Sequence, residues 1–382
     1  MRALIFAGLA ALLTGIGLGR FAYAALVPGM IGAGQVDVVG AGYLAAANVA
    51  GYLLGAATGG RVGQWLGVGN ALRGAMIGTT LALLACAMPF SLLWLILARF
   101  AAGVTGGYLM VLAAPSVLAG VPAERRGIAG GIMFTGVGLG IVFSGVVVPL
   151  LAGIGPGPAW AGLAALAGIL TVVTWRFWPE RPVVPAAVPL APGPLRPGRP
   201  RLLLLGMAYG SDAIGFVPHT VYWVDFVARE LGYGIGMGGI QWTLFGLGAA
   251  AGPAIMGLIA QRIGFGGAFV LALSVKAIVV VLPVVWTSIP GLVISSLMVG
   301  ALSPATASLA AGRTTELLRA DRRQQAWARL TMLFAVVQAV GAVLMARLID
   351  ATGHMALLFL VGGAVLAGGA VLAEWHRRSA TG

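Results

Sequence analysis

The sequence predicts an all-α polytopic membrane protein, with twelve transmembrane helices arranged as two pseudo-symmetric six-helix bundles. The first observation is composition: 60% of the residues are hydrophobic and only 9% are charged, whereas a soluble domain carries roughly 25% charged residues. The second is a series of apolar segments of about 20 residues, the length that crosses a bilayer as a helix. The third is an internal repeat at an offset of 197 residues, as expected of a duplicated membrane transporter.

The apolar segments divide into six before residue 179 and six after residue 201. Backbone polar groups in lipid must be satisfied within the segment, and these runs lack the alternation of barrel strands, so each is expected to be a helix. The expected spans are 3–30, 38–60, 71–89, 91–119, 128–152 and 158–178, then 202–228, 236–261, 266–287, 289–311, 325–349 and 354–374.

The two sets of spans are separated by residues 179–201, which contain eight prolines and four arginines. Proline lacks the N–H that a helix requires, so this segment is expected to be an extended cytoplasmic linker. The sequence therefore predicts an N-terminal bundle at 1–178, the linker at 179–201 and a C-terminal bundle at 202–382.

The distribution of basic residues predicts the orientation. With the N-terminus in the cytoplasm, 18 of the 23 Lys and Arg residues fall on the cytoplasmic side, as the positive-inside rule requires. We therefore expect a multi-pass protein of the bacterial inner membrane, with both termini cytoplasmic and the first apolar run retained as a helix. The net charge of +13 resides in these loop clusters, so no nucleic-acid partner is expected.

The residues of enzymes and metal sites do not gather anywhere in the sequence. Cys86 is the single cysteine, and the three histidines are widely scattered. Motifs for zinc, nucleotide phosphates or dithiol chemistry are absent. We expect no catalytic residues, no metal and no cofactor.

The repeat is clearest in two short loops, GRVGQWLG at 60–67 and GLIAQRIG at 257–264. The offset also places several helix glycines on each other, and the acid-Arg-Arg triplet 124–126 on 321–323. We expect the two loops to form the gating motif, through Gly60, Gln64, Gly67, Gly257, Gln261, Arg262 and Gly264.

Six plus six helices around a polar linker resemble the major facilitator superfamily over essentially the whole chain. The two loops stand where that family carries Gly-x-x-x-Asp-Arg-x-Gly, RFAAGVTGG at 99–107 is similar to its fourth-helix arginine motif, and GVGLGIVFSG at 136–145 resembles the fifth-helix motif of its antiporters. GLGRFAY at 17–23 together with 136–151 looks most like the bacterial YbfB/YjiJ-type branch. The resemblance implies alternating access between two bundles, with helices one, four, seven and ten lining the cavity.

Two departures from the family pattern affect what the resemblance implies. Gln64 and Gln261 replace the loop acid, which in the family pairs with a basic residue and latches one gate state. An amide hydrogen-bonds more weakly than a charge-assisted pair. The fifth-helix segment has Ser144-Gly145 in place of the antiporter Gly-Pro.

Charged residues within spans are the main functional candidates, because charge at membrane depth is costly. Arg20 is expected to bind an anionic substrate group beside Tyr23, the alternative being an arginine that snorkels to the interface. Asp212 is the best proton-binding candidate, the alternative being permanent pairing with Arg20 or Arg99. The resemblance links Arg99 to coupling.

Other polar candidates are weaker. His219 is included in proton coupling, although a solvated place at the outer end of helix seven is favoured for it and for Asp225. Lys276, the only lysine, lies in helix nine, which in the family stands away from the cavity. Tyr108 and Trp242 are possible cavity residues, with helix packing as the alternative.

Helices four and ten carry glycine or proline at matching places, which predicts softened segments near the binding region. These residues are Gly103, Gly106, Gly107, Gly300 and Pro304.

We therefore expect a monomeric secondary active transporter of a small, anionic organic solute, coupled to H⁺ and leaning to export. The alternatives are proton-coupled uptake or uniport of a small organic acid and, from another class, a polytopic membrane enzyme or a channel.

Overall fold

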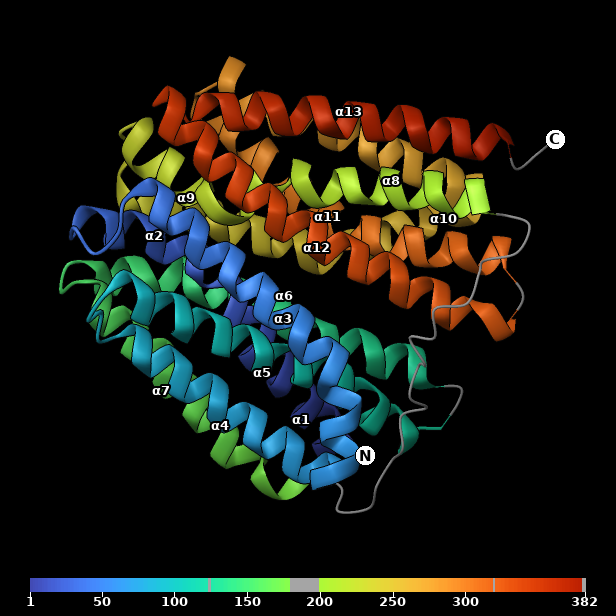
Figure 1. Ribbon diagram of the computed structural model, residues 1–382, viewed down its shortest axis with the longest axis horizontal. Coiled ribbons are helices and arrows are strands. Elements are labelled where there is room, and N and C mark those ends of the chain that lie inside the picture. Colours follow the sequence, from blue (N-terminus) through green and yellow to red (C-terminus); the bar gives the residue numbers. More distant parts are fainter. Residues whose placement is uncertain (123–124, 179–198, 319, 380–382) are drawn as a thin grey trace. The chain divides into compact units, whose positions relative to one another are not determined.

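The computed structural model describes residues 1–122, 125–178, 199–318 and 320–379, and in these ranges the chain is helical with no strand (Figure 1). Ten helical segments of the described residues are long and apolar enough to cross a membrane. The helices up to residue 177 are α1 (Arg2–Leu12), η1 (Leu13–Phe21), α2 (Tyr23–Gly32), α3 (Val38–Leu66), α4 (Val68–Cys86), α5 (Leu92–Ala119), α6 (Arg126–Ala152), α7 (Pro156–Thr174) and η3 (Trp175–Phe177).

The later helices are α8 (Arg199–Gly215), η4 (Pro218–Tyr222), α9 (Trp223–Asp225), η5 (Phe226–Glu230), α10 (Gly234–Val285), α11 (Ile289–Leu317), α12 (Ala320–Thr352) and α13 (Ala356–Ser379). The fold class is confirmed, and the described elements account for all twelve predicted spans. One of the ten long segments, α10, contains two spans that divide at Gly264. The seventh span is broken into α8, η4, α9 and η5, none of which is long enough alone.

The described residues form two compact units. Unit 1 contains the residues before 179 together with Trp223–Gly246, and unit 2 contains 199–222 and the described residues from Leu247 onward. Most of the predicted linker, residues 179–198, lies outside the described residues.

The 197-residue repeat appears as the same helix crossing in each unit. In unit 1, α3 packs closely along α5, and a Cβ on Gly51 or Gly55 would overlap the carbonyl oxygens of Phe100 and Val104. In unit 2, a Cβ on Gly248 or Gly252 would overlap the carbonyl oxygens of Leu297 and Ala301. All four residues of one crossing lie 197 positions from those of the other, so the repeated glycines exist because two backbones touch there.

The repeat also sets where two helices end. Gly67 follows α3 with φ +80°, and Gly264 divides α10 with φ +76°. A positive φ is unfavourable for residues with a Cβ. Glycine at this place in each half therefore makes the sharp turn from one span to the next.

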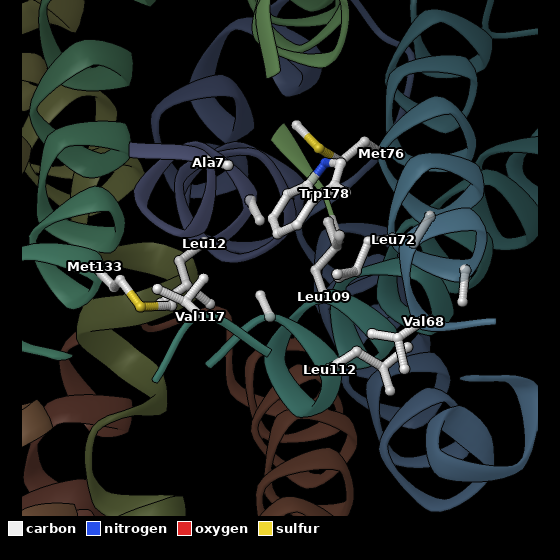
Figure 2. Close-up of a cluster of buried hydrophobic side chains, with 14 of the residues drawn as sticks. Ala7, Leu12, Val68, Leu72, Met76, Leu109, Leu112, Val117, Met133 and Trp178 are labelled. Atoms are coloured by element: carbon white, nitrogen blue, oxygen red, sulfur yellow. The ribbon is translucent and has the colours of Figure 1, made fainter. Parts of the chain in front are cut away.

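Unit 1 has an apolar core where α1, α4, α5 and α6 converge (Figure 2). Leu12, Met76, Leu109 and Met133 are each fully buried in it, and Trp178 packs into the same cluster. Trp178 is the last described residue before 179–198, so this side chain fixes the end of the N-terminal helices to their core.

Candidate functional site

The first and seventh spans depart from α-helical geometry, and the candidates Arg20 and His219 lie within these departures. Leu13–Phe21 is π-helical in unit 1, and Pro218–Tyr222 is π-helical in unit 2. Such turns are rare in proteins overall, and those that occur are often found at functional sites. Glycines 15, 17 and 19 lie in the first of these segments, and Pro218 begins the second.

Arg99 of α5 holds the end of the π-helical segment in unit 1. Its side chain is 1% exposed, and its Nη1 donates a 2.8 Å hydrogen bond to the carbonyl oxygen of Gly19. Asn48 Nδ2 donates to the same oxygen at 3.2 Å and to the Arg99 carbonyl at 3.0 Å. One carbonyl of the first span thus accepts from two neighbouring helices.

The charge of Arg99 is met by aromatic rings. Its guanidinium carbon lies 4.5 Å from the ring centre of Tyr23 and 5.7 Å from that of Trp160. Among the described residues, no carboxylate lies within ion-pair distance of Arg99. The Arg99 cage, as we call Gly19, Tyr23, Asn48 and Trp160, therefore holds a cation with dipoles and π faces.

Arg20 is half-buried in unit 1, with its guanidinium carbon 5.4 Å from the ring centres of both Phe21 and Tyr52. Tyr23, its predicted neighbour in the substrate site, is buried under Arg99 and donates from its hydroxyl to the Ala41 carbonyl at 2.8 Å. Tyr52 therefore takes the place beside Arg20 that was predicted for Tyr23.

Asp212 of α8 lies at the centre of a buried cluster in unit 2. Lys276 Nζ donates to Asp212 Oδ1 at 2.7 Å, and Thr306 Oγ1 donates to Oδ2 at 2.6 Å. All three side chains are fully buried. The alternative considered for Asp212, pairing with Arg20 or Arg99, named the wrong partner, because its ion pair is with Lys276.

Lys276 is the functional candidate that the sequence undervalued. Its Nζ also lies 4.5 Å from the ring centre of Phe216. The family pattern placed helix nine away from the cavity, yet α10 directs this side chain onto α8. The signal was its uniqueness, since a single lysine inside a span requires a counter-charge.

His219 lies in η4 and is fully buried, so the solvated position favoured for it is wrong. Its Nε2 lies 2.8 Å from Ser295 Oγ, and Ser295 Oγ donates to the Val279 carbonyl at 2.7 Å. A serine hydroxyl has one hydrogen, so His219 Nε2 must carry a proton and donate to Ser295.

Asp225 is also buried, and it forms an ion pair with Arg229 one turn later. The expectation of a solvated Asp225 is therefore wrong as well. An i, i+4 acid–base pair neutralises the carboxylate locally.

The two aromatic candidates differ in exposure. Trp242 is fully buried, stacks on Phe245 with ring centres 4.8 Å apart and donates from Nε1 to Ser144 Oγ at 3.2 Å. Tyr108 is half-buried and its hydroxyl accepts from Thr58 Oγ1 at 3.4 Å. The contacts of Trp242 are those of a packing residue, which was the alternative for it.

The predicted gate loops contain the turn glycines Gly67 and Gly264 but no latch on the glutamines. Gln64, Gln261 and Arg262 are exposed, and within the described residues their side chains make no hydrogen bond. In unit 2 a different acid ties the loop: Glu316 accepts from the Phe265 N–H at 3.1 Å and from Arg313 at 2.6 Å.

The glycines predicted to soften helix four instead permit close packing. α5 and α11 are continuous helices across these positions, including Pro304 and Gly300. A Cβ on Gly103, Gly106 or Gly107 would meet backbone oxygens of α3 or η1. The departures from α geometry lie in the first and seventh spans, so the hinge role of these residues stays a prediction.

The two segments that suggested the YbfB/YjiJ-type branch are in contact in unit 1. A Cβ on Gly17 would meet the Cα of Gly140, and a Cβ on Gly140 would meet the Cα of Gly17. Both motifs are therefore halves of one crossing between η1 and α6.

The described residues contain no group of three or more His, Cys, Asp or Glu side chains suited to a metal ion. What the two units do contain is a caged arginine in one and a buried ion pair in the other.

Solved structures with this fold are membrane transporters. The chain superposes on the D-xylose-proton symporter with a TM-score of 0.77, 15% identity and coverage of 97% of this chain and 96% of that one. It superposes on a variant of the nucleoside transporter NupG with a TM-score of 0.76, 14% identity and 99% coverage of both chains. At these identities the likeness shows that the three chains share a fold.

Residues 12–374 match the family described as "Uncharacterised MFS-type transporter YbfB". The chain belongs to this family, and it is a multi-pass membrane transporter rather than an enzyme. No sequence among curated proteins matches it.

Proposed function

We propose that this protein is a proton-coupled secondary transporter of a small anionic organic solute, working by alternating access in the bacterial inner membrane. Both termini lie in the cytoplasm, and the working unit is a monomer with H⁺ and the solute as its partners. The fold shared with a D-xylose-proton symporter supports the choice of the proton as coupling ion.

The observation that carries the proposal is the buried pair of Asp212 and Lys276. Their charged atoms lie 2.7 Å apart, and the two side chains are 1% and 0% exposed. Buried ion pairs rarely add stability compared with apolar side chains of similar size. A charge pair kept inside a span is better explained by a charge that changes during transport.

The anionic solute is supported by the excess of cations in unit 1. Arg99 is buried without a carboxylate within ion-pair distance among the described residues. Its guanidinium donates to the Arg20 carbonyl at 3.4 Å, so this buried cation of α5 contacts the backbone of the first span at Arg20. Cationic groups on two neighbouring helices favour an anionic solute.

Export is the direction that the fifth-helix resemblance favours. Uptake of a small organic acid is the alternative, and the half-buried, cationic Arg20 favours it.

The test is flux through purified protein in liposomes. We expect saturable counterflow of a labelled carboxylate. We also expect the carboxylate to accumulate against its own concentration gradient when a pH difference is imposed across the membrane. Asp212→Asn is expected to abolish the pH-driven accumulation while counterflow partly survives, because the solute site remains and the proton site does not.

The matched control is Asp350→Asn, which removes an exposed carboxylate from α12 and is expected to leave both fluxes unchanged. Accumulation driven by the pH difference in Asp212→Asn would remove the proton role from Asp212.

A further inference from the structure

We infer that Lys276 is a latent carboxylate-binding group that becomes available when Asp212 takes up a proton, so that one proton and one anion bind together in unit 2. The inference rests on the proposed proton role of Asp212. It adds the residue that holds the anion and fixes the coupling as co-transport. Under an inward proton gradient co-transport means uptake, so the inference selects the alternative direction given above in place of export.

Burial makes the Lys276 ammonium dependent on a nearby counter-charge. The Lys276 ammonium is 0% exposed, and Asp212 is the carboxylate 2.7 Å from it. An isolated buried charge is strongly unfavourable. When Asp212 is protonated the ammonium loses its counter-charge, and a carboxylate brought by the solute restores it.

The hydrogen bonds of Thr306 can satisfy Asp212 both when it is ionised and when it is protonated. Thr306 Oγ1 lies 2.6 Å from Asp212 Oδ2 and 2.9 Å from the Ser303 carbonyl oxygen. With Asp212 ionised, the Thr306 hydroxyl donates to Oδ2. With a proton on Oδ2, the acid donates to Thr306 Oγ1, whose own hydrogen turns to Ser303. One hydroxyl rotation accommodates the proton, and no heavy atom moves.

The Asp212–Lys276 pair lies next to a break in the seventh span. The Asp212 carbonyl accepts from the Phe216 N–H at 3.2 Å, and the π-helical η4 begins two residues later at Pro218. The Phe216 ring covers the ammonium at 4.5 Å. A small change in this π-helical region would move Phe216 and open a route to Lys276.

The corresponding positions in unit 1 carry no charged side chains. The residues 197 positions before Asp212, Lys276 and Thr306 are Gly15, Thr79 and Leu109. A Cβ on Gly15 would meet Leu109 Cδ1 at 2.8 Å, so the positions that correspond to Asp212 and Thr306 are also neighbours in unit 1. The same helix arrangement is built there without charge, so the charges are specific to unit 2.

Among the other ionisable groups in the described part of unit 2, His219 is the one on which the charge of Lys276 acts electrostatically. It is held with its proton on Nε2 by Ser295. The other charged side chains on the elements around α8 stand toward helix ends: Arg262 on α10, Arg313 and Glu316 on α11, Arg329, Arg347 and Asp350 on α12, and Glu374, His376, Arg377 and Arg378 on α13.

The first experiment uses the wild-type protein and measures affinity against pH. The probes are glucuronate, gluconate and succinate, with glucose, glucitol and succinamide as uncharged counterparts, in calorimetry between pH 5.5 and 8.5. If one proton enters with each anion, the affinity for at least one carboxylate rises by about tenfold for each unit of falling pH. Carboxylate affinities that do not rise as pH falls would overturn the inference.

The second experiment uses the only lysine as its own reporter. Lysine labelled with ¹³C at Cε gives one side-chain signal, whose shift reports whether Lys276 is charged. In Asp212→Asn, we expect a neutral lysine in probe-free buffer and a charged one with the carboxylate that binds the wild type, at pH 8.5 as at pH 6. If none of the three carboxylates changes the chemical shift of the Lys276 Cε in a folded Asp212→Asn protein, the inference is contradicted.

Two further variants guard against misfolding. Lys276→Met removes the anion group and is expected to lose the pH-dependent affinity, and Asp212→Asn combined with Lys276→Met removes both charges, so that no unpaired charge remains. If the double variant retains the wild-type dependence of carboxylate affinity on pH, the inference is wrong.

The two proposals fail in different ways. Proton-driven carboxylate flux in wild-type liposomes, with a lysine signal that no carboxylate alters, would leave the proposed function intact and reject Lys276 as the anion group. Absence of proton-driven flux would reject the proposed function whatever the lysine signal does.

Discussion

At the scale of single residues, the two units neutralise a buried cation in different ways. Arg99 in unit 1 contacts the Gly19 carbonyl and two aromatic rings, whereas Lys276 in unit 2 contacts the carboxylate of Asp212. Carbonyl dipoles and π faces are permanent. A carboxylate can be neutralised by one proton, so the proposed mechanism assigns proton coupling to unit 2 and not to Arg99.

This difference predicts unequal costs of removing the two cations. Lys276→Met leaves a bare carboxylate and is expected to destabilise the protein by about 3–5 kcal/mol. Arg99→Met removes one of the two donors to the neutral Gly19 carbonyl and leaves no unpaired charge, and it is expected to cost about 1–3 kcal/mol. Thermal unfolding in detergent at pH 8 measures both.

The double variant with Asp212→Asn and Lys276→Met is the control, and it is expected to regain most of the loss seen in Lys276→Met. Equal stability of Lys276→Met and the double variant would mean that the two charges do not interact in the folded protein.

At the residue level, the sequence predicted which charged side chains lie within spans but not how they pair. Asp212 and Arg99 became candidates because a charge inside an apolar run is conspicuous in any sequence. The partner of Asp212 was missed, because two residues 64 positions apart meet only through helix packing that the sequence does not encode locally. His219 was misplaced for the same reason.

At the scale of elements, glycine does two separate tasks. Gly51 and Gly248 let helices touch backbone to backbone, while Gly60 and Gly257 in the same helices face open space. The repeat aligns both pairs equally well, so the sequence could not separate contact glycines from the rest.

This leads to a paired prediction. Gly51→Ala and Gly248→Ala are each expected to destabilise by about 1–3 kcal/mol, because the new methyl overlaps a carbonyl oxygen of the neighbouring helix. Gly60→Ala and Gly257→Ala are expected to be neutral or to stabilise by up to about 1 kcal/mol, because alanine favours a helix. The melting temperatures of the four variants give the comparison. Equal changes in melting temperature for all four would refute the close backbone contact at Gly51 and Gly248.

The π-helical segment of the first span gives a second prediction for an element. Asn48→Ala removes the donor that bridges Gly19 to the Arg99 carbonyl, and it is expected to loosen residues 13–21 in particular. Hydrogen exchange of that segment should rise more than that of α7. Uniform exchange across unit 1 would show that Asn48 does not fix the break.

At the scale of the whole molecule, the 197-residue repeat accounts for the helix crossing that both units share, and the candidate functional residues lie where the two halves differ. The helix class, the spans and the repeat were predictable, because they depend on composition and on local spacing. The functional cluster was only partly predictable: Gly15, Thr79 and Leu109 occupy the places that Asp212, Lys276 and Thr306 occupy in the other half, and the repeat register alone does not tell which mismatches are in contact.

The central claim is that a proton and an anion cross together because both bind at Asp212 and Lys276. The direct measurement is the lumenal pH of proteoliposomes, reported by a trapped dye, after an inward gradient of glucuronate, gluconate or succinate is imposed with the membrane potential clamped. These charged acids cross lipid poorly unaided. We predict that the lumen acidifies with the wild type and not with Asp212→Asn or with the uncharged counterparts. A lumen that stays constant or becomes alkaline with the wild type would contradict the account.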